Sequence, residues 1–278
     1  MPFTTFGDDV GVAVDADAVI PSGWRPLTAM PLVILVGVTG VGKSTTIAAL
    51  AAHAPDLRVL PDRRTLTDAL IIAHLQQADG EPVAPVTDRA ARFAYTRRYR
   101  AQFPGGMAHA LAQLRVAPHA TGPLLFDGLR GADEVGAAVT RFPLAAFAVL
   151  DAPDEVRVQR LLGRGDVFDQ IDSRTDHTGD DWTALGVPEA ATFLDADVQA
   201  RLRNLVATGE VTAQELAAKL RIVAEERRNY DPAAARATLT ELAPARTVVI
   251  DTTRHTPAVA ATMIAPMLRR SRTSSPGR

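Results

Sequence analysis

The sequence predicts an α/β fold in which a five-stranded parallel sheet carries helices on both faces. Five short apolar runs suit buried strands, at residues 32–36, 57–60, 123–127, 144–150 and 247–250. Helical patterns separate these runs almost throughout the chain. Strands that alternate with helices form parallel sheets covered on both sides, which is the basis of the prediction.

Each element has a local justification. Residues 32–36 are continuously apolar, as in strands buried on both faces. The helix predicted at 44–53 stops before Pro55, and the helix at 88–102 stops before Pro104-Gly105-Gly106. Apolar periodicity and terminal Pro or Gly residues place the other helices at 65–77, 107–116, 132–140, 154–162, 196–207, 212–228, 232–242 and 257–268.

These elements predict one main domain at 31–268, preceded by an extension at 1–30 and followed by a disordered tail at 269–278. Two long insertions interrupt the domain, at about 61–122 and 164–244. Both leave the carboxyl edge of the sheet, where such folds bind ligands. Both insertions could therefore cover a bound ligand.

The composition excludes several classes of protein. The chain has 278 residues, a net charge of −2 and no cysteine. Disulfides, cysteine-ligated zinc and thiol nucleophiles are therefore excluded. Balanced charge argues against nucleic acid as a partner, and no apolar run is long enough for a membrane span. The N-terminus lacks a secretory pattern, so we expect a cytoplasmic protein of undetermined oligomeric state.

Residues Gly37 to Ser44 match the phosphate-binding pattern G-x-x-x-x-G-K-[ST] between an apolar strand and a helix. Backbone amides in such a loop point at phosphate oxygens, and the helix N-terminus adds positive potential. The P-loop NTPase fold, ATP and Mg²⁺ follow as predictions. Lys43, expected to be exposed, would act on the β- and γ-phosphates, and Ser44 would bind the metal. The predicted nucleotide contacts are Gly37, Val38, Thr39, Gly40, Val41, Gly42, Lys43, Ser44 and Thr45.

A second metal-binding element is predicted at Asp127, which ends the apolar run 123–127. Carboxylates at such strand ends hold magnesium in P-loop enzymes. Asp151 and Asp251 end similar runs, and Asp127 could instead cap the next helix. Asp127 is preferred because Arg130 follows it closely and could face phosphate.

An ordered series of segments resembles nucleoside monophosphate kinase-type enzymes, and it is most similar to the guanylate kinase and ribose-bisphosphate phosphokinase branch. The segments are Phe126-Asp-Gly-Leu-Arg-Gly131, Arg141-Phe-Pro143, Ala148-Val-Leu-Asp-Ala-Pro153 and Arg157-Val-Gln-Arg160-Leu-Leu-Gly-Arg164-Gly165. The resemblance implies that the P-loop holds ATP and that the first insertion holds the phosphate acceptor. It also implies that the second insertion is a lid that supplies arginines, and that the loop with Thr252 and Arg254 lines the adenine.

Phosphoryl transfer independently requires cations around the transferred group. Arg157, Arg160 and Arg164 recur on one helix face, and glycines flank Arg164. Arg160 and Arg164 are therefore catalytic candidates. The alternative is a solvated face that pairs with Asp154 or Glu155.

The acceptor side contains Asp62, Arg63 and Arg64, which directly follow the second strand. Asp62 could orient the attacking hydroxyl, and the arginines could bind an anionic group. Asp62 could alternatively cap the next helix. Further candidates for the acceptor are Arg92, Tyr95 and Arg130. The segment differs from that of guanylate kinases, so GMP is not implied.

Together these features predict a kinase that transfers the γ-phosphoryl group of ATP–Mg²⁺ to a small molecule. Candidate acceptors are a nucleotide, a phosphorylated sugar or a natural-product precursor. Two alternatives remain, a P-loop ATPase that acts as a switch or partner-binding protein, and a kinase with a macromolecular acceptor.

Overall fold

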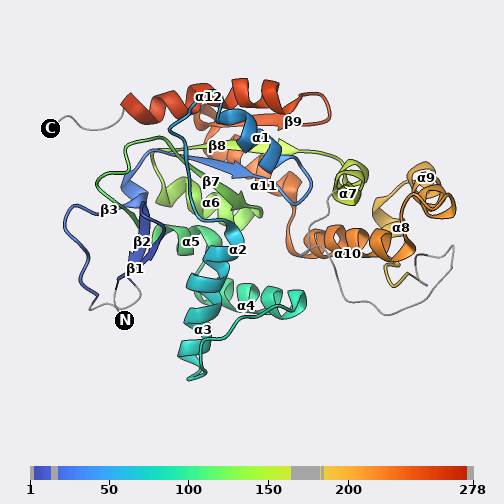
Figure 1. Ribbon diagram of the computed structural model, residues 1–278, viewed down its shortest axis with the longest axis horizontal. Helices are drawn as coiled ribbons and strands as arrows, with labels where there is room; N and C mark the ends of the chain where they lie inside the picture. Colours follow the sequence, from blue (N-terminus) through green and yellow to red (C-terminus); the bar gives the residue numbers. More distant parts are fainter. Residues whose placement is uncertain (1–2, 14–17, 164–181, 183–184, 274–278) are drawn as a thin grey trace.

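The computed structural model describes residues 3–13, 18–163, 182 and 185–273. Its main sheet has the predicted five parallel strands, in the order β5-β7-β4-β8-β9 (Figure 1). The strands are β4 (Leu32–Val36), β5 (Arg58–Val59), β7 (Leu124–Leu129), β8 (Ala145–Asp151) and β9 (Thr247–Asp251). The predicted α/β class is confirmed.

Helices cover both faces of this sheet. α1 (Lys43–Leu50) and α12 (Pro257–Thr273) pack on one face, whereas α5 (Met107–Ala112), α6 (Ala132–Arg141) and α11 (Pro232–Leu242) pack on the other. Alternate side chains of β4 enter the two cores: Ile34 faces the α5–α6 side, and Leu35 faces the α1 side. Burial on both faces explains why this strand is continuously apolar.

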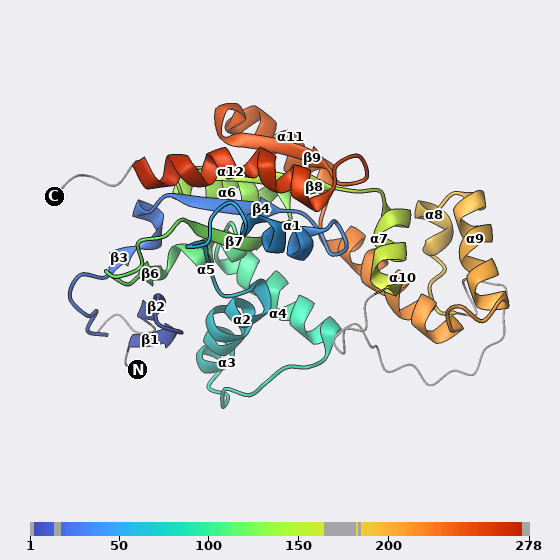
Figure 2. The same ribbon diagram turned by 45° about the horizontal axis from the view of Figure 1, so that its top comes forward.

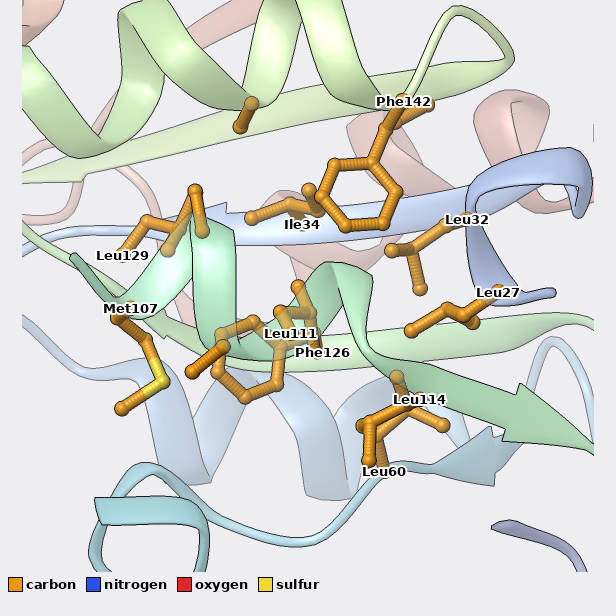
Figure 3. Packing of buried hydrophobic residues seen from close by; sticks show 14 of the residues in the cluster. Leu27, Leu32, Ile34, Leu60, Met107, Leu111, Leu114, Phe126, Leu129 and Phe142 are labelled. Carbon is orange, nitrogen blue, oxygen red and sulfur yellow. The ribbon is translucent and has the colours of Figure 1, made fainter. Parts of the chain in front are cut away.

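The core on the α5–α6 side joins strands and helices from distant parts of the chain. Figure 3 shows Phe142, at the end of α6, next to Ile34 and Leu32 of β4, with Phe126 of β7 nearby. All four side chains have at most 1% of their surface exposed. Burying each contributes roughly 1.5–3 kcal/mol, so this core fixes the strands whose ends carry the candidate site.

A second, four-stranded antiparallel sheet forms from β1 (Phe3–Phe6), β2 (Val10–Ala13), β3 (Arg25–Pro26) and β6 (Leu114–Val116). The predicted helix at 107–116 is therefore wrong beyond its first part, because α5 ends at Ala112 and a strand follows. Leu114 pairs with Val12 and Val116 with Val10, and all four side chains are buried. This pairing with a distant strand outweighs the local helical pattern.

The part of the first insertion before α5 forms a helical arm, which lies below the sheet in Figure 1 and is made of α2 (Arg63–Leu66), a π-helical turn (Thr67–Ile72), α3 (Ala73–Ala78) and α4 (Arg89–Gln102). Short 3₁₀ turns at Leu27–Ala29 and Pro244–Arg246 complete the connections.

The second insertion contributes α8 (Ala190–Phe193), α9 (Ala196–Ala207) and α10 (Ala213–Asn229), which pack with α7 (Asp154–Leu162) around their own apolar core. Figure 2 shows this helical unit beyond the carboxyl ends of β4 and β8. Contrary to the predicted tail from residue 269, α12 continues to Thr273. Among the described residues, no helix is both long and apolar enough to cross a membrane.

Candidate functional site

The candidate site lies where the chain diverges to the two faces of the sheet. After β4 the chain enters α1 on one face, and after the neighbouring β7 it enters α6 on the other. Ligands of open α/β sheets bind in the crevice that such divergence creates at the strands' carboxyl ends. The loop Gly37–Gly42 and Asp127 both lie at this edge.

Glycine is required at Gly40 and at Gly42 of the loop. Gly40 has a φ of 88°, and a Cβ atom there would lie 3.1 Å from the Arg157 backbone. Gly42, with a φ of 93°, is the N-cap of α1. Glycine alone enters this left-handed region without strain, so the loop can turn tightly and expose amides at the helix N-terminus.

Lys43 is folded back onto the loop. Its Nζ donates hydrogen bonds of 3.0 Å to the carbonyl oxygens of Gly37 and Val38, and lies 3.8 Å from Asp127 Oδ1. Only 11% of the side chain is exposed, so the expectation of an exposed lysine is wrong. Burial lowers the pKa of Lys43, although Asp127 opposes the shift. Ser44 and Thr45 are exposed in the first turn of α1.

Asp127 sits at a β-bulge between β7 and β4, a feature that redirects side chains near active sites. Its Oδ1 is buried and accepts no hydrogen bond from any described residue. By contrast, Asp151 pairs with Arg236 at 3.3 Å, and Asp251 accepts from the Thr253 amide at 2.8 Å. Of the three aspartates, Asp127 is the one beside Lys43. A hard cation such as Mg²⁺ suits this carboxylate with the Ser44 hydroxyl, the remaining positions going to phosphate and water.

Glu226 of α10 joins the helical unit to the loop. Its carboxylate accepts from the Thr39 amide (3.0 Å), the Thr39 hydroxyl (2.5 Å), Arg130 Nη1 (2.6 Å) and Arg157 Nη2. Arg157 also donates to the Thr39 carbonyl at 2.8 Å and to Asp154. Burial alone would raise the pKa of Glu226, but Arg130, Arg157 and Thr39 outweigh burial and hold it below its ordinary value.

Sequence reasoning did not identify Glu226. The available signal was positional, because Glu226 follows the buried residues Val223 and Ile222 by three and four positions on the same face of α10. A carboxylate in an apolar stripe is either paired or functional.

Next to the loop lies a cavity of about 400 Å³, here called the arginine cavity. Its lining residues come from the first insertion, the loop, the segment after β7 and the end of α10; they are Thr39, Arg63, Arg64, Thr67, Thr87, Arg89, Arg92, Phe93, Thr96, Arg130 and Tyr230. Four of the predicted acceptor residues, Arg63, Arg64, Arg92 and Arg130, are thus brought together. Tyr95 is not in this lining and packs against the core on the α5–α6 side.

Arg63 anchors one wall of the arginine cavity. Its guanidinium donates to both oxygens of the buried Glu134, at 2.9 and 2.6 Å, to the Gly128 carbonyl, and to the Tyr230 hydroxyl at 3.1 Å. Burial opposes the charge, but Glu134 and Tyr230 outweigh it and raise the pKa of Arg63. The guanidinium therefore remains cationic and rigid.

Asp62 caps α2. Its Oδ1 accepts from the Thr65 amide at 2.8 Å, and it does not line the arginine cavity in the described part of the chain. We expect Asp62→Ala to lower the free energy of unfolding by about 1 kcal/mol, whereas Asp62→Asn keeps the cap. Turnover of Asp62→Asn should be unchanged. A turnover reduced about 10²-fold with normal melting would instead support the predicted role at the acceptor hydroxyl.

A second cavity of about 350 Å³ lies on the other side of the loop and is lined by Gly42, Thr45, Thr46, Arg160, Thr252, His255, Pro257 and Ala260. Arg160 donates to the carbonyl and hydroxyl oxygens of Thr252 at 2.7 and 2.9 Å. Two predicted site residues therefore meet here. Arg254 is 82% exposed and pairs with Asp251, and Arg164 lies outside the described residues.

No protein-family model matches this chain, and no curated protein matches it. Among solved structures, the chain is similar to an unliganded sugar kinase from Janibacter sp. HTCC2649, with 16% sequence identity and a TM-score of 0.37. The match covers 89% of this chain and 99% of that chain. Because both the identity and the TM-score are low, the function is inferred below from the residues of the site.

Proposed function

We propose that this protein is a P-loop phosphotransferase that moves the γ-phosphoryl group of ATP–Mg²⁺ to a small anionic acceptor. The observation that carries the proposal is Lys43, held under a left-handed glycine loop at a helix N-terminus, 3.8 Å from a carboxylate whose buried oxygen has no hydrogen-bond donor among the described residues. Cationic and amide donors that converge beside a metal-binding carboxylate form the usual site for a nucleoside triphosphate.

Each residue then has a chemical task. The loop amides and the N-terminus of α1 bind the phosphates, and Lys43 leaves its two loop carbonyls to contact the terminal phosphates. Ser44 and Asp127 hold Mg²⁺, which when bound neutralises charge on the phosphates. The cavity beside Thr252 and Arg160 accommodates the nucleoside, consistent with the predicted adenine contact at Thr252.

The acceptor is assigned to the arginine cavity. Thr39 belongs both to the loop and to the cavity lining, so an acceptor held there lies next to the terminal phosphate. Guanidinium groups recognise phosphate and carboxylate through paired hydrogen bonds, and Phe93 and Tyr230 offer flat surfaces to a ring. These features favour a nucleotide or a phosphorylated sugar over an uncharged precursor.

The direct test is a screen of pooled phosphorylated metabolites with ATP–Mg²⁺, read by product mass. A product heavier by one phosphoryl group supports the proposal. ATP hydrolysis that no pool accelerates would contradict it and support the alternative ATPase.

Asp127→Asn is expected to raise the magnesium concentration required for half-maximal rate and to lower the maximal rate about 10–100-fold, as losses around metal sites do. The physical reason is the loss of an anionic ligand beside Lys43. A magnesium titration of the initial rate is the measurement, with Asp151→Asn as the matched control. If only the control changes the magnesium requirement, the metal has been assigned to the wrong strand.

Arg89→Gln should raise the KM for the acceptor about tenfold or more while leaving the KM for ATP nearly unchanged, because Arg89 lines the arginine cavity on the acceptor side. Arg98→Gln is the control, since Arg98 lies on the same helix but pairs with Asp79 away from the cavity. Equal effects of the two variants on acceptor KM would remove the acceptor from this cavity.

A further inference from the structure

Glu226 places a carboxylate against the phosphate-binding loop, although it comes from the distant helix α10. The side chain is fully buried, and each of its two oxygens has at least two donors within hydrogen-bond distance. Two donors are the amide and hydroxyl of Thr39, and two are the guanidinium groups of Arg130 and Arg157. This donor set, consisting of a loop amide, a hydroxyl and two arginines, is the kind of set that binds a phosphate group.

The Glu226 carboxylate lies where the proposed function places the terminal phosphate, because it binds Thr39. Thr39 belongs both to the loop and to the lining of the arginine cavity, so under the proposed function the transferred phosphoryl group lies close to its amide. The negative charge of Glu226 also acts on the Lys43 ammonium group and favours its charged form, which raises the pKa of Lys43 against the effect of burial. Phosphate and carboxylate therefore compete for the same donors, and two anions at this distance repel each other strongly in a buried site.

We infer that Glu226 stands in for the terminal phosphate when no triphosphate is bound, and that ATP must displace it. The inference rests on the proposed function. A diphosphate is shorter, so it can occupy the loop while Glu226 stays on Thr39. The triphosphate takes over Thr39, Arg130 and Arg157, and the carboxylate moves away with the end of α10.

Displacement of Glu226 also changes the acceptor cavity. Glu226 lies in the last turn of α10, and its carbonyl accepts from the Tyr230 amide at 2.7 Å. Tyr230 in turn lines the arginine cavity and contacts Arg63. ATP binding thereby reshapes the wall against which the acceptor packs, which couples the two substrates.

The test compares the affinities for ADP–Mg²⁺ and for the non-hydrolysable imido analogue of ATP, measured by calorimetry on Glu226→Gln and the wild type. Removing the competing charge should tighten analogue binding at least about tenfold relative to ADP, the change that 1.4 kcal/mol produces. Glu155→Gln is the matched control, because Glu155 belongs to the same helical unit but pairs with Arg201. Its ratio of the two affinities should equal that of the wild type.

Hydrogen exchange on the wild-type protein tests the same inference without any variant. The ATP analogue should increase amide exchange in the last turns of α10, and ADP should not. Protection of α10 by the analogue, or weaker analogue binding by Glu226→Gln, would overturn the inference and make Glu226 a support for the loop. Absence of nucleotide binding by wild type and variants alike would overturn the proposed function itself.

Discussion

Replacing Lys43 with methionine is expected to lower the rate of phosphoryl transfer about 10²–10³-fold, the usual loss when one donor to transition-state charge is removed. The substitution keeps an unbranched stem of similar length in a site where 11% of the side chain is exposed. It removes only the ammonium group, which donates hydrogen bonds to two loop carbonyls. Single-turnover transfer from labelled ATP measures the effect, and urea denaturation checks the fold.

The chain offers a matched control because its only other lysine is Lys219. Lys219→Met makes the same change in α10, two turns before Glu226, and should leave the transfer rate within about twofold of the wild type. The folding stability of Lys43→Met should be equal to or above that of the wild type, since a buried ammonium group carries a desolvation cost. Normal transfer by a folded Lys43→Met enzyme would exclude Lys43 from catalysis.

Arg157→Met should destabilise the protein by about 3–5 kcal/mol, the range found when one partner of a buried ion pair is removed. The Arg157 side chain is 2% exposed and donates to Glu226, Asp154 and the Thr39 carbonyl. Glu226 keeps Arg130 as a partner, which places the expected loss near the lower end of that range. Urea denaturation monitored by circular dichroism gives the free energy of unfolding.

The double variant Arg157→Met/Glu226→Met tests whether the loss of stability comes from breaking the buried ion pair or only from removing a large side chain. Apolar replacement of both partners removes the unpaired charge, so the double variant should recover much of the lost stability. Arg201→Met, which breaks an exposed pair with Glu155, should change stability by less than about 1 kcal/mol. A double variant whose loss of stability equals the sum of the two single losses would show that the two residues do not act as a pair.

Features with a local physical cause were predictable from the sequence. Four strands of the main sheet are short, mostly apolar segments, and α7, α9 and α11 have the predicted bounds, because periodicity and terminal turn residues define them. The glycine loop was predictable for the same reason, since its conformation depends on glycines within a few residues of one another. Arg63, Arg64 and Arg92 of the first insertion were predicted as acceptor residues and line the arginine cavity. Arg89 lines the same cavity but was not among the predicted acceptor residues.

The sequence by itself determined the α/β sheet and the loop with Lys43. Only the tertiary structure decided that Glu226 contacts Thr39 across 187 positions of the chain, that Tyr230 closes the arginine cavity, and that 114–116 is a strand. The same holds for the placement of Asp127 beside Lys43, whereas Asp151 pairs with Arg236. Such contacts form when separate elements pack and bury shared surface, and no local pattern of residues specifies which distant side chain fills a given position.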